Sequence, residues 1–254
     1  MNPLLIIKDL TVAVGAKVLV NNVSFEVPRG KIVAIAGGSG SGKTTIGLSI
    51  LRLLSPALSI KQGSIIFEGH SLLGLPVREM QNCRGARIGM VFQEPLSAFD
   101  PLFTIGHQLD EVLVAHTQLS KQERDKKILE TLSEVELPDP QRAYKSYPHQ
   151  LSGGMRQRAM VAQAMVCGPS LIIADEPTSN LDITLQIKIM GLLGRLKSKN
   201  ISILLITHDL GMISHVADEV IILRQGMVVE KGPVGQVIGQ PQHEYTKELI
   251  EVFQ

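Results

Sequence analysis

The strongest constraint on this chain is a glycine-rich run that lies between a strand pattern and a helix pattern. Residues 37–44 read Gly-Gly-Ser-Gly-Ser-Gly-Lys-Thr, after a continuous apolar strand predicted at 31–36 and before helical apolar spacing at 43–54. In the order strand, loop, helix, the pattern G-x-x-x-x-G-K-S/T binds nucleotide phosphates. A glycine-rich turn with a chance lysine is the alternative, which the flanking strand and helix disfavour. The sequence therefore predicts a phosphate-binding loop in an α/β fold.

The residue types in this loop suit a triphosphate. Glycines let successive backbone N–H groups turn toward one anion, and the N-terminus of the following helix adds a partial charge of about +0.5. Lys43 would contact the β- and γ-phosphates, and the Thr44 hydroxyl would bind Mg²⁺. The predicted ATP-binding residues of the loop are Gly37, Gly38, Ser39, Gly40, Ser41, Gly42, Lys43, Thr44 and Thr45.

A second apolar strand, predicted at 171–175, ends in two carboxylates. Ligands of open α/β sheets bind beyond the carboxyl ends of the strands, where these side chains lie. We expect Asp175 to hold Mg²⁺, directly or through water, and Glu176 to act as the general base for the attacking water. Two acids after a strand also occur in solvated turns, but the phosphate loop upstream favours the functional interpretation.

Strand and helix patterns alternate over most of the chain, which predicts a parallel α/β sheet. The strand patterns lie at 10–14, 18–27, 31–36, 65–68, 88–92, 171–175, 201–207 and 219–223. Between about 102 and 166 only helical patterns occur, such as 123–135. We expect a single domain over residues 1–254, with a core at about 1–92 and 167–232, a helical subdomain at about 93–166 and a short helical tail at 233–254.

Composition and charge exclude several classes of protein. The 25 basic and 24 acidic residues give a formal net charge of +1, which argues against binding nucleic acid by broad neutralisation of phosphates. No apolar run approaches the roughly 20 residues that span a bilayer, and the N-terminus lacks the basic start of a secretory signal. Cys83 and Cys167 have no metal-ligand spacing, so we expect ordinary thiols. These features predict a cytosolic protein that reaches a membrane only through a partner.

A third motif, at residues 151–157, opens another helix. It reads Leu-Ser-Gly-Gly-Met-Arg-Gln, and Ser152 with the two glycines would form a second anion-binding helix N-terminus. One nucleotide on one chain has no evident use for two such termini. Together with the loop and the acidic strand, this motif resembles the signature of the nucleotide-binding subunits of ATP-binding cassette (ABC) transporters, over residues from about 4 to 250. The resemblance implies a P-loop NTPase with a RecA-like parallel-sheet core, an N-terminal antiparallel β subdomain and a helical insert.

The resemblance also assigns roles to further residues. It implies that Gln93 contacts Mg²⁺ and water, that His208 reaches the γ-phosphate, and that both are catalytic with Glu176. A histidine after a strand is usually a core or loop residue, but His208 ends the next strand after the acidic one. The implied metal ligands are Thr44, Gln93 and Asp175. Residues implied to act across a dimer interface are Leu151, Ser152, Gly153, Gly154 and Gln157 of the signature, and Ser179 and Asp182 of an interface loop.

One position departs from the family pattern. Members of the family usually stack the adenine on an aromatic side chain near the end of the first strand, where this chain has Val14. Aromatic packing contributes about 1 kcal/mol beyond the area buried. We therefore expect Val14 to contact the base. The affinity for the base should be a few-fold weaker than with an aromatic residue at this position, and the base specificity should be looser.

The cargo class is suggested by residues 91–106 and 242–249, which resemble importers of oligopeptides, dipeptides and nickel. Peptide importers usually continue into a cysteine-bearing extension that this sequence lacks, so we expect a nickel or nickel-chelate importer, with a dipeptide or oligopeptide importer as the alternative. An exporter is disfavoured by these segments and by the lack of a fused membrane domain. A soluble cassette ATPase of DNA repair or ribosomes is disfavoured because such proteins carry long coiled coils or two cassettes.

The resemblance implies a set of partners as well. They are ATP and Mg²⁺, a second ABC ATPase chain that is homologous but different, two membrane-spanning permease subunits and an extracytoplasmic substrate-binding protein. No nucleic-acid partner is expected. The chain would lie on the cytoplasmic face of the inner membrane, held there by the permease subunits.

Overall fold

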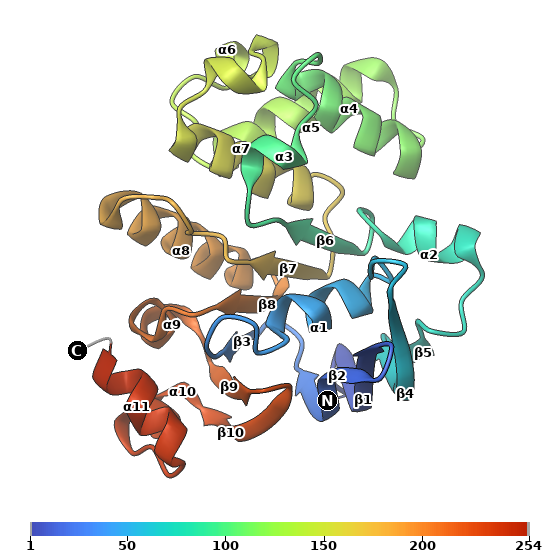
Figure 1. Cartoon of the computed structure of the whole chain (residues 1–254). Helices are drawn as coiled ribbons and strands as arrows, with labels where there is room; N and C mark the ends of the chain where they lie inside the picture. The colour runs from blue at the N-terminus through green and yellow to red at the C-terminus, as the bar shows by residue number, and fades with distance from the viewer. Residues whose placement is uncertain (1, 253–254) are drawn as a thin grey trace. The chain divides into compact units, whose positions relative to one another are not determined.

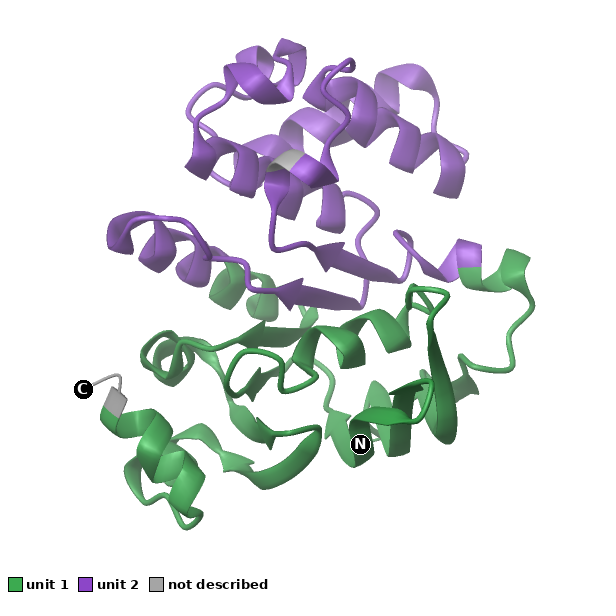
Figure 2. Cartoon of the chain, in the orientation of Figure 1, with its two compact units in different colours: residues 1–80, 193–254 green, residues 81–192 purple. Residues whose placement is uncertain are grey.

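The computed structural model describes residues 2–252. The chain forms two compact units, one of residues 1–80 and 193–254 and the other of residues 81–192 (Figure 2). The predicted helical subdomain at 93–166 falls wholly within the second unit. The last two residues of the predicted tail, 253–254, lie outside the described range.

Strands and helices follow one another in the order shown in Figure 1. The strands are β1 (Leu5–Val14), β2 (Lys17–Val27), β3 (Ile32–Ala36), β4 (Leu58–Phe67), β5 (His70–Ser71), β6 (Ile88–Val91), β7 (Leu171–Asp175), β8 (Ser202–Thr207), β9 (Glu219–Arg224) and β10 (Met227–Pro233). The helices are α1 (Lys43–Ile50), α2 (Val77–Cys83), α3 (Pro95–Ala98), α4 (Ile105–His116), α5 (Lys121–Glu134), α6 (Pro140–Lys145), the 3₁₀ helix η1 (Pro148–Gln150), α7 (Gly153–Met165), α8 (Ile183–Ser198), α9 (Leu210–Val216), α10 (Val234–Gly239) and α11 (Glu244–Val252).

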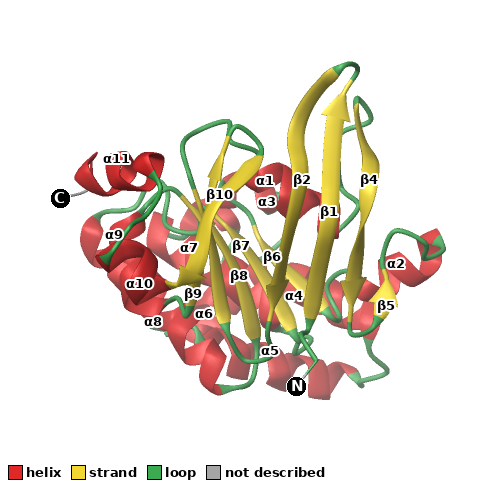
Figure 3. Ribbon diagram, turned by 90° about the horizontal axis from the view of Figure 1, so that it is seen from below, coloured by secondary structure: helices red, strands yellow, loops and turns green. Residues whose placement is uncertain are grey.

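The first unit begins with an antiparallel sheet in the order β2-β1-β4-β5, whose long strands run side by side in Figure 3. This confirms the predicted antiparallel β subdomain. The register of β1 shifts near Asp9, which has a φ of 51°, and the Asp9 N–H donates to the Ser24 hydroxyl at 2.8 Å. Opposite this irregularity, a Cβ on Gly63 would lie 2.6 Å from the backbone of β1, so only glycine fits there.

The same unit contains the parallel strands β8, β3 and β9, with β10 antiparallel to β9. Every residue of β3 and β8 is buried, as expected for parallel strands covered on both faces. The helix predicted at 43–54 is too long, because α1 ends at Ile50. Arg52 adopts the left-handed conformation (φ 52°), which helices do not continue through, and its guanidinium donates to the Leu75 carbonyl at 2.6 Å.

The second unit combines the parallel pair β6 and β7 with helices α3 to α7 and the start of α8. All of β7 is buried. Residues 102–166 contain helices and no strand, as predicted. Together, the two units bear out the predicted α/β class, with parallel strands, an antiparallel subdomain and a helical segment.

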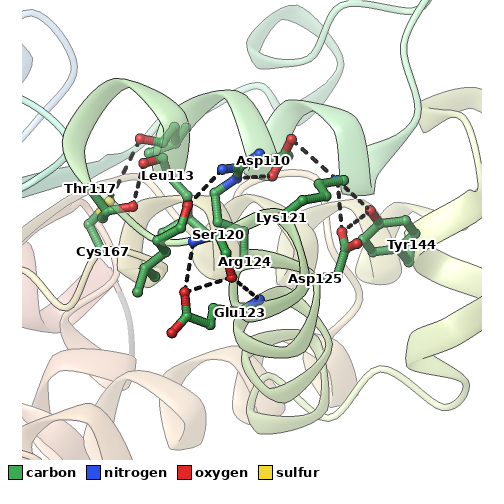
Figure 4. Close-up of polar contacts among 12 residues, drawn as sticks. Asp110, Leu113, Thr117, Ser120, Lys121, Glu123, Arg124, Asp125, Tyr144 and Cys167 are labelled. Atoms are coloured by element: carbon green, nitrogen blue, oxygen red, sulfur yellow. Dashed lines mark hydrogen bonds and ion pairs between the residues drawn. The ribbon is translucent and has the colours of Figure 1, made fainter.

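A polar network joins α4, α5 and α6 in the second unit (Figure 4). Arg124 donates to Asp110 at 2.6 Å, and Lys121 lies 3.3 Å from Asp110 and 2.8 Å from Asp125. The Tyr144 hydroxyl donates to Asp125 at 2.6 Å. Burial raises the pKa of Asp110, but hydrogen bonds and charges from Arg124 and Lys121 more than offset this, so that its pKa lies below its usual value.

Replacing Asp110 by Ala should lower the free energy of unfolding by about 2 kcal/mol at pH 7, because a charge-assisted hydrogen bond is lost and Arg124 keeps no carboxylate partner. The pKa of Asp110 is lower in the folded chain, so its contribution is present above the unfolded pKa and lost as pH falls through the folded value. Urea unfolding at pH 7 and in acid should therefore show a difference between wild type and variant that shrinks in acid.

The control is Glu130→Gln, which removes an exposed ion pair with Lys126 at 3.9 Å. That change should alter stability by less than about 0.5 kcal/mol. Equal losses for the two variants, or a difference that is independent of pH, would contradict the assigned role of Asp110.

Candidate nucleotide-binding site

The loop between β3 and α1 has a backbone that specific glycines permit. Gly37 has a φ of 155°, and a Cβ there would lie 2.1 Å from the Leu223 carbonyl oxygen. Gly42, with a φ of 103°, would place a Cβ 2.8 Å from the Leu19 carbonyl oxygen. Both contacts are with backbone atoms, so a larger residue would displace a strand. The glycines of the motif are therefore required by close packing as well as by their conformation.

The loop curls around the ammonium group of Lys43. This side chain is buried, and its Nζ donates to the carbonyls of Gly37 at 2.8 Å and Gly38 at 2.9 Å. The Ser41 hydroxyl is buried and has no hydrogen-bond partner within residues 2–252. A buried cation beside an unsatisfied hydroxyl is a cradle that phosphate oxygens would complete. The residues of the loop thus fit the phosphates of a nucleoside triphosphate.

The other predicted residues of this loop lie around the cradle. Ser39, Gly40 and Thr44 are exposed, and Thr45 is half-buried in the first turn of α1. Thr44 is the second residue of α1, and its hydroxyl carries acceptor lone pairs of the kind that bind a metal ion. Thr44 therefore has the position expected of a hydroxyl that binds a metal ion beside the phosphates.

His208 leaves the same edge of the sheet as the phosphate loop. β3 and β8 are parallel neighbours, and Ala36, just before the loop, pairs with Thr207, just before His208. His208 is exposed, while Asp209 starts α9 by accepting a hydrogen bond from the Met212 N–H at 2.9 Å. The cap fixes the turn after β8, so His208 lies at the carboxyl edge of the strands, where ligands of α/β sheets bind.

A matching edge in the second unit carries the predicted catalytic and metal-binding residues. β6 and β7 are parallel, and Val91 pairs with Ala174. Gln93 follows the first strand, and Asp175 ends the second. The Ser179 hydroxyl lies 3.1 Å from the Gln93 carbonyl oxygen. The structure therefore brings Gln93, Asp175 and Ser179 to one end of this strand pair.

Glu176 has an unusual backbone for a glutamate. Its φ is 47°, in the left-handed region, and only 9% of the residue is exposed. The Ser179 hydroxyl and N–H lie 3.0 and 3.2 Å from its carbonyl oxygen. Non-glycine residues in this conformation cost of order 1 kcal/mol and cluster at functional sites. The strain supports a role for the Glu176 side chain that outweighs its conformational cost.

The signature motif divides into a buried and an exposed part. Leu151, Gly154 and Gln157 are buried within the second unit, and a Cβ on Gly154 would lie 2.9 Å from the Leu185 side chain. Ser152 is exposed and caps α7, where it accepts a hydrogen bond from the Met155 N–H at 3.3 Å; Gly153 is exposed as well. The helix N-terminus thus presents Ser152 and Gly153 to solvent, as a contact with another subunit requires.

The two remaining predicted residues have local structural roles. Asp182 caps α8 by accepting a hydrogen bond from the Leu185 N–H at 3.0 Å. Val14 is half-buried at the end of β1, where it pairs with Lys17 and Leu58 around the turn at Gly15. The roles of Asp182 at a dimer interface and of Val14 beside a base stay predictions.

Each unit thus assembles one group of predicted residues. The phosphate loop and His208 belong to the first unit, and Gln93, Asp175, Glu176, Ser179 and the signature belong to the second. Sequence reasoning missed one residue that contacts the loop. This residue is Tyr245, whose hydroxyl accepts a hydrogen bond from the Gly38 N–H. The only signal for it was the resemblance of the segment that contains Tyr245.

No helix among residues 2–252 combines the length and the apolar character needed to cross a membrane.

Comparison with known proteins places the chain in a family. The ABC transporter family matches residues 20–179. "Peptidoglycan transport ATP-binding protein YejF" of Agrobacterium fabrum is 45% identical, and the match covers 98% of this chain and 46% of YejF. "Dipeptide transport ATP-binding protein DppD" of Bacillus subtilis is 44% identical, over 93% of this chain and 71% of DppD.

A solved structure shares the fold. The dimeric ATP-binding cassette MJ0796, in a post-hydrolysis state bound to ADP and Pi, is 30% identical and superposes with a TM-score of 0.80. That match covers 91% of this chain and 98% of the MJ0796 chain. The fold is therefore that of an ABC cassette, as expected from the sequence. By sequence and by fold, this chain belongs to the ABC transporter family, as an ATP-binding cassette.

Proposed function

We propose that this chain hydrolyses ATP to energise an ABC importer of peptides. The observation that carries the proposal is the phosphate cradle around Lys43, at the same sheet edge as His208. Residues 1–254 would act as a single nucleotide-binding domain. Lys43 and the loop N–H groups would bind the phosphates, and Glu176 would take a proton from the attacking water.

The residues fit Mg²⁺ as well. Thr44, Gln93 and Asp175 offer a hydroxyl, an amide oxygen and a carboxylate, which are the oxygen ligands that magnesium prefers. When bound by these residues, Mg²⁺ would neutralise negative charge on the phosphates during hydrolysis. His208 would add a hydrogen bond to the γ-phosphate, and the exposed Ser152 and Gly153 would contact a nucleotide held by a second cassette.

The choice of cargo class rests on the relatives. YejF and DppD are named for peptidoglycan and dipeptide transport, and neither is named for nickel. This favours the alternative weighed from the sequence, a peptide importer, over the nickel importer first expected. No side chain of a cytoplasmic ATPase needs to touch the cargo, so the nickel expectation depended on chain length alone.

The proposed assembly follows from a site completed by two chains. A second, homologous cassette would supply the opposing signature, and the dimeric MJ0796 cassette is a precedent for such pairing. Two permease subunits would bind the pair at the cytoplasmic face of the inner membrane, and an external binding protein would deliver the peptide.

The purified complex tests the proposal through its ATPase rate. Dipeptides or oligopeptides with the binding protein should raise the rate above its basal value, and Ni²⁺ should not. A complex that carries Lys43→Met should show neither rate, because the phosphate cradle is lost. Stimulation by Ni²⁺ alone would favour the nickel-importer hypothesis instead. An ATPase rate that responds to neither cargo would contradict an importer of either kind.

A further inference from the structure

The C-terminal helix α11 contacts the phosphate loop through Tyr245. Its hydroxyl accepts a hydrogen bond from the Gly38 N–H at 2.9 Å, across 207 positions of sequence within the first unit. A Cβ on Gly38 would lie 3.1 Å from this hydroxyl, so the side chain rests directly on the loop. A segment far from every cassette motif in the sequence therefore reaches the proposed nucleotide site.

Gly38 is held from two directions. Its N–H donates to Tyr245, and its carbonyl accepts from the Lys43 ammonium at 2.9 Å and from the Ser41 N–H at 3.3 Å. The Lys43 ammonium has three N–H donors, so phosphate oxygens would compete with the loop carbonyls for them. The contact with Tyr245 does not involve Lys43, so it can persist through that competition.

The ring of Tyr245 is itself held in place. The Arg224 guanidinium, at the end of β9, lies 4.6 Å from the ring centroid in a cation–π contact. The preceding residue, Leu223, packs its carbonyl against Gly37. Two residues at the end of β9 therefore hold this region in place: Leu223 contacts the phosphate loop, and Arg224 contacts the Tyr245 ring.

The backbone before α11 is anchored to β10. The two carboxylate oxygens of Glu230 accept hydrogen bonds from the N–H groups of Gln242 at 2.9 Å and His243 at 3.0 Å. Burial raises the pKa of Glu230, but the hydrogen bonds from the Gln242 and His243 N–H groups help to offset this effect, and that pKa lies below its usual value. Glu230 is thus an ionised clamp at neutral pH.

From this geometry we infer that Tyr245 is a positioning residue for ATP binding, which rests on the proposed function of the site. Its hydroxyl keeps Gly38 in place while the phosphates compete with the loop carbonyls for Lys43. A glycine-rich loop has much backbone freedom to lose on binding, and a loop already fixed loses less. Tyr245 therefore raises the affinity for nucleotide without touching the reacting atoms.

Tyr245→Phe removes the hydroxyl and keeps the ring over Arg224. In the nucleotide-free, full-length chain, amide hydrogen exchange at residues 37–43 should become faster by about two- to tenfold, as expected for the loss of one neutral hydrogen bond. The equilibrium Kd for ATP should rise by about the same factor. In the assembled complex, KM for ATP should rise while kcat at saturating ATP stays unchanged.

Two further variants sharpen the test. Glu230→Gln weakens the clamp on Gln242 and His243 and should shift exchange and Kd in the same direction. Lys247→Met, which removes an exposed ion pair with Glu244 on the same helix, should change neither quantity. If Tyr245→Phe leaves either loop exchange or the Kd for ATP at the wild-type value, the inference is wrong. Failure of the wild-type chain to bind ATP would instead contradict the proposed function, and loop exchange can be measured without nucleotide.

Discussion

Replacing Glu176 by Gln is expected to lower the ATPase rate of the assembled complex by about two to four orders of magnitude, the usual contribution of a general base. Glutamine has nearly the same shape but cannot take a proton from water. The buried, left-handed position of Glu176 at the end of β7 should accommodate the amide without loss of fold. Nucleotide affinity should therefore stay close to that of the wild type while the turnover rate falls.

The measurement compares steady-state phosphate release with the equilibrium Kd for ATP in the same preparations. Glu79→Gln, at an exposed position on α2, is the matched control and should leave both quantities unchanged. A Glu176→Gln complex that hydrolyses ATP at the wild-type rate would remove Glu176 from the mechanism.

Replacing Ser152 by Arg should lower the ATPase rate of the assembled pair by about 100-fold, a loss typical when a group that stabilises the developing charge is removed. The isolated chain should bind ATP with unchanged affinity, because its own phosphate cradle lies in the other unit of the chain. Ser152 is exposed, so a longer side chain fits on the surface but would, on the proposed pairing, obstruct the approach of a second cassette.

The control for Ser152→Arg must account for a lost helix cap. Ser152 caps α7 and Ser120 caps α5, each accepting a hydrogen bond from the third residue of its helix, and the Ser120 hydroxyl also donates to the Glu123 carboxylate at 2.7 Å. Ser120→Arg should therefore lose at least as much stability as Ser152→Arg, about 1 kcal/mol or more, while the complex keeps its ATPase rate. Equal ATPase rates for both variants would show that Ser152 acts only as a cap.

The sequence predicted the strand ends well because each signal is local. An apolar run followed by glycines or acids places functional side chains at a carboxyl edge, and β7 covers the predicted residues 171–175. The pairing of Ala36 with Thr207 follows from parallel neighbours in one sheet. In the structure, residues 37–44 follow β3, Asp175 ends β7 and His208 follows β8, as the predicted strands imply, while the roles of these residues at a nucleotide stay predictions.

Other features depend on contacts that no local pattern encodes. The end of α1 is set by the left-handed backbone of Arg52, and β10 was missed because Gly232 and Pro233 are untypical of a strand. The hydrogen bond between Tyr245 and Gly38 joins residues 207 positions apart. The sequence also did not determine the cargo, since an ATPase subunit has no need to contact it.

A structure of the Glu176→Gln complex trapped with MgATP would show whether a second cassette completes the triphosphate-binding site. The Ser152 hydroxyl of this chain should lie within hydrogen-bond distance, about 3 Å, of the γ-phosphate bound by the opposing cassette. A closed, nucleotide-loaded complex in which Ser152 is remote from every bound triphosphate would contradict completion of the site by a second cassette.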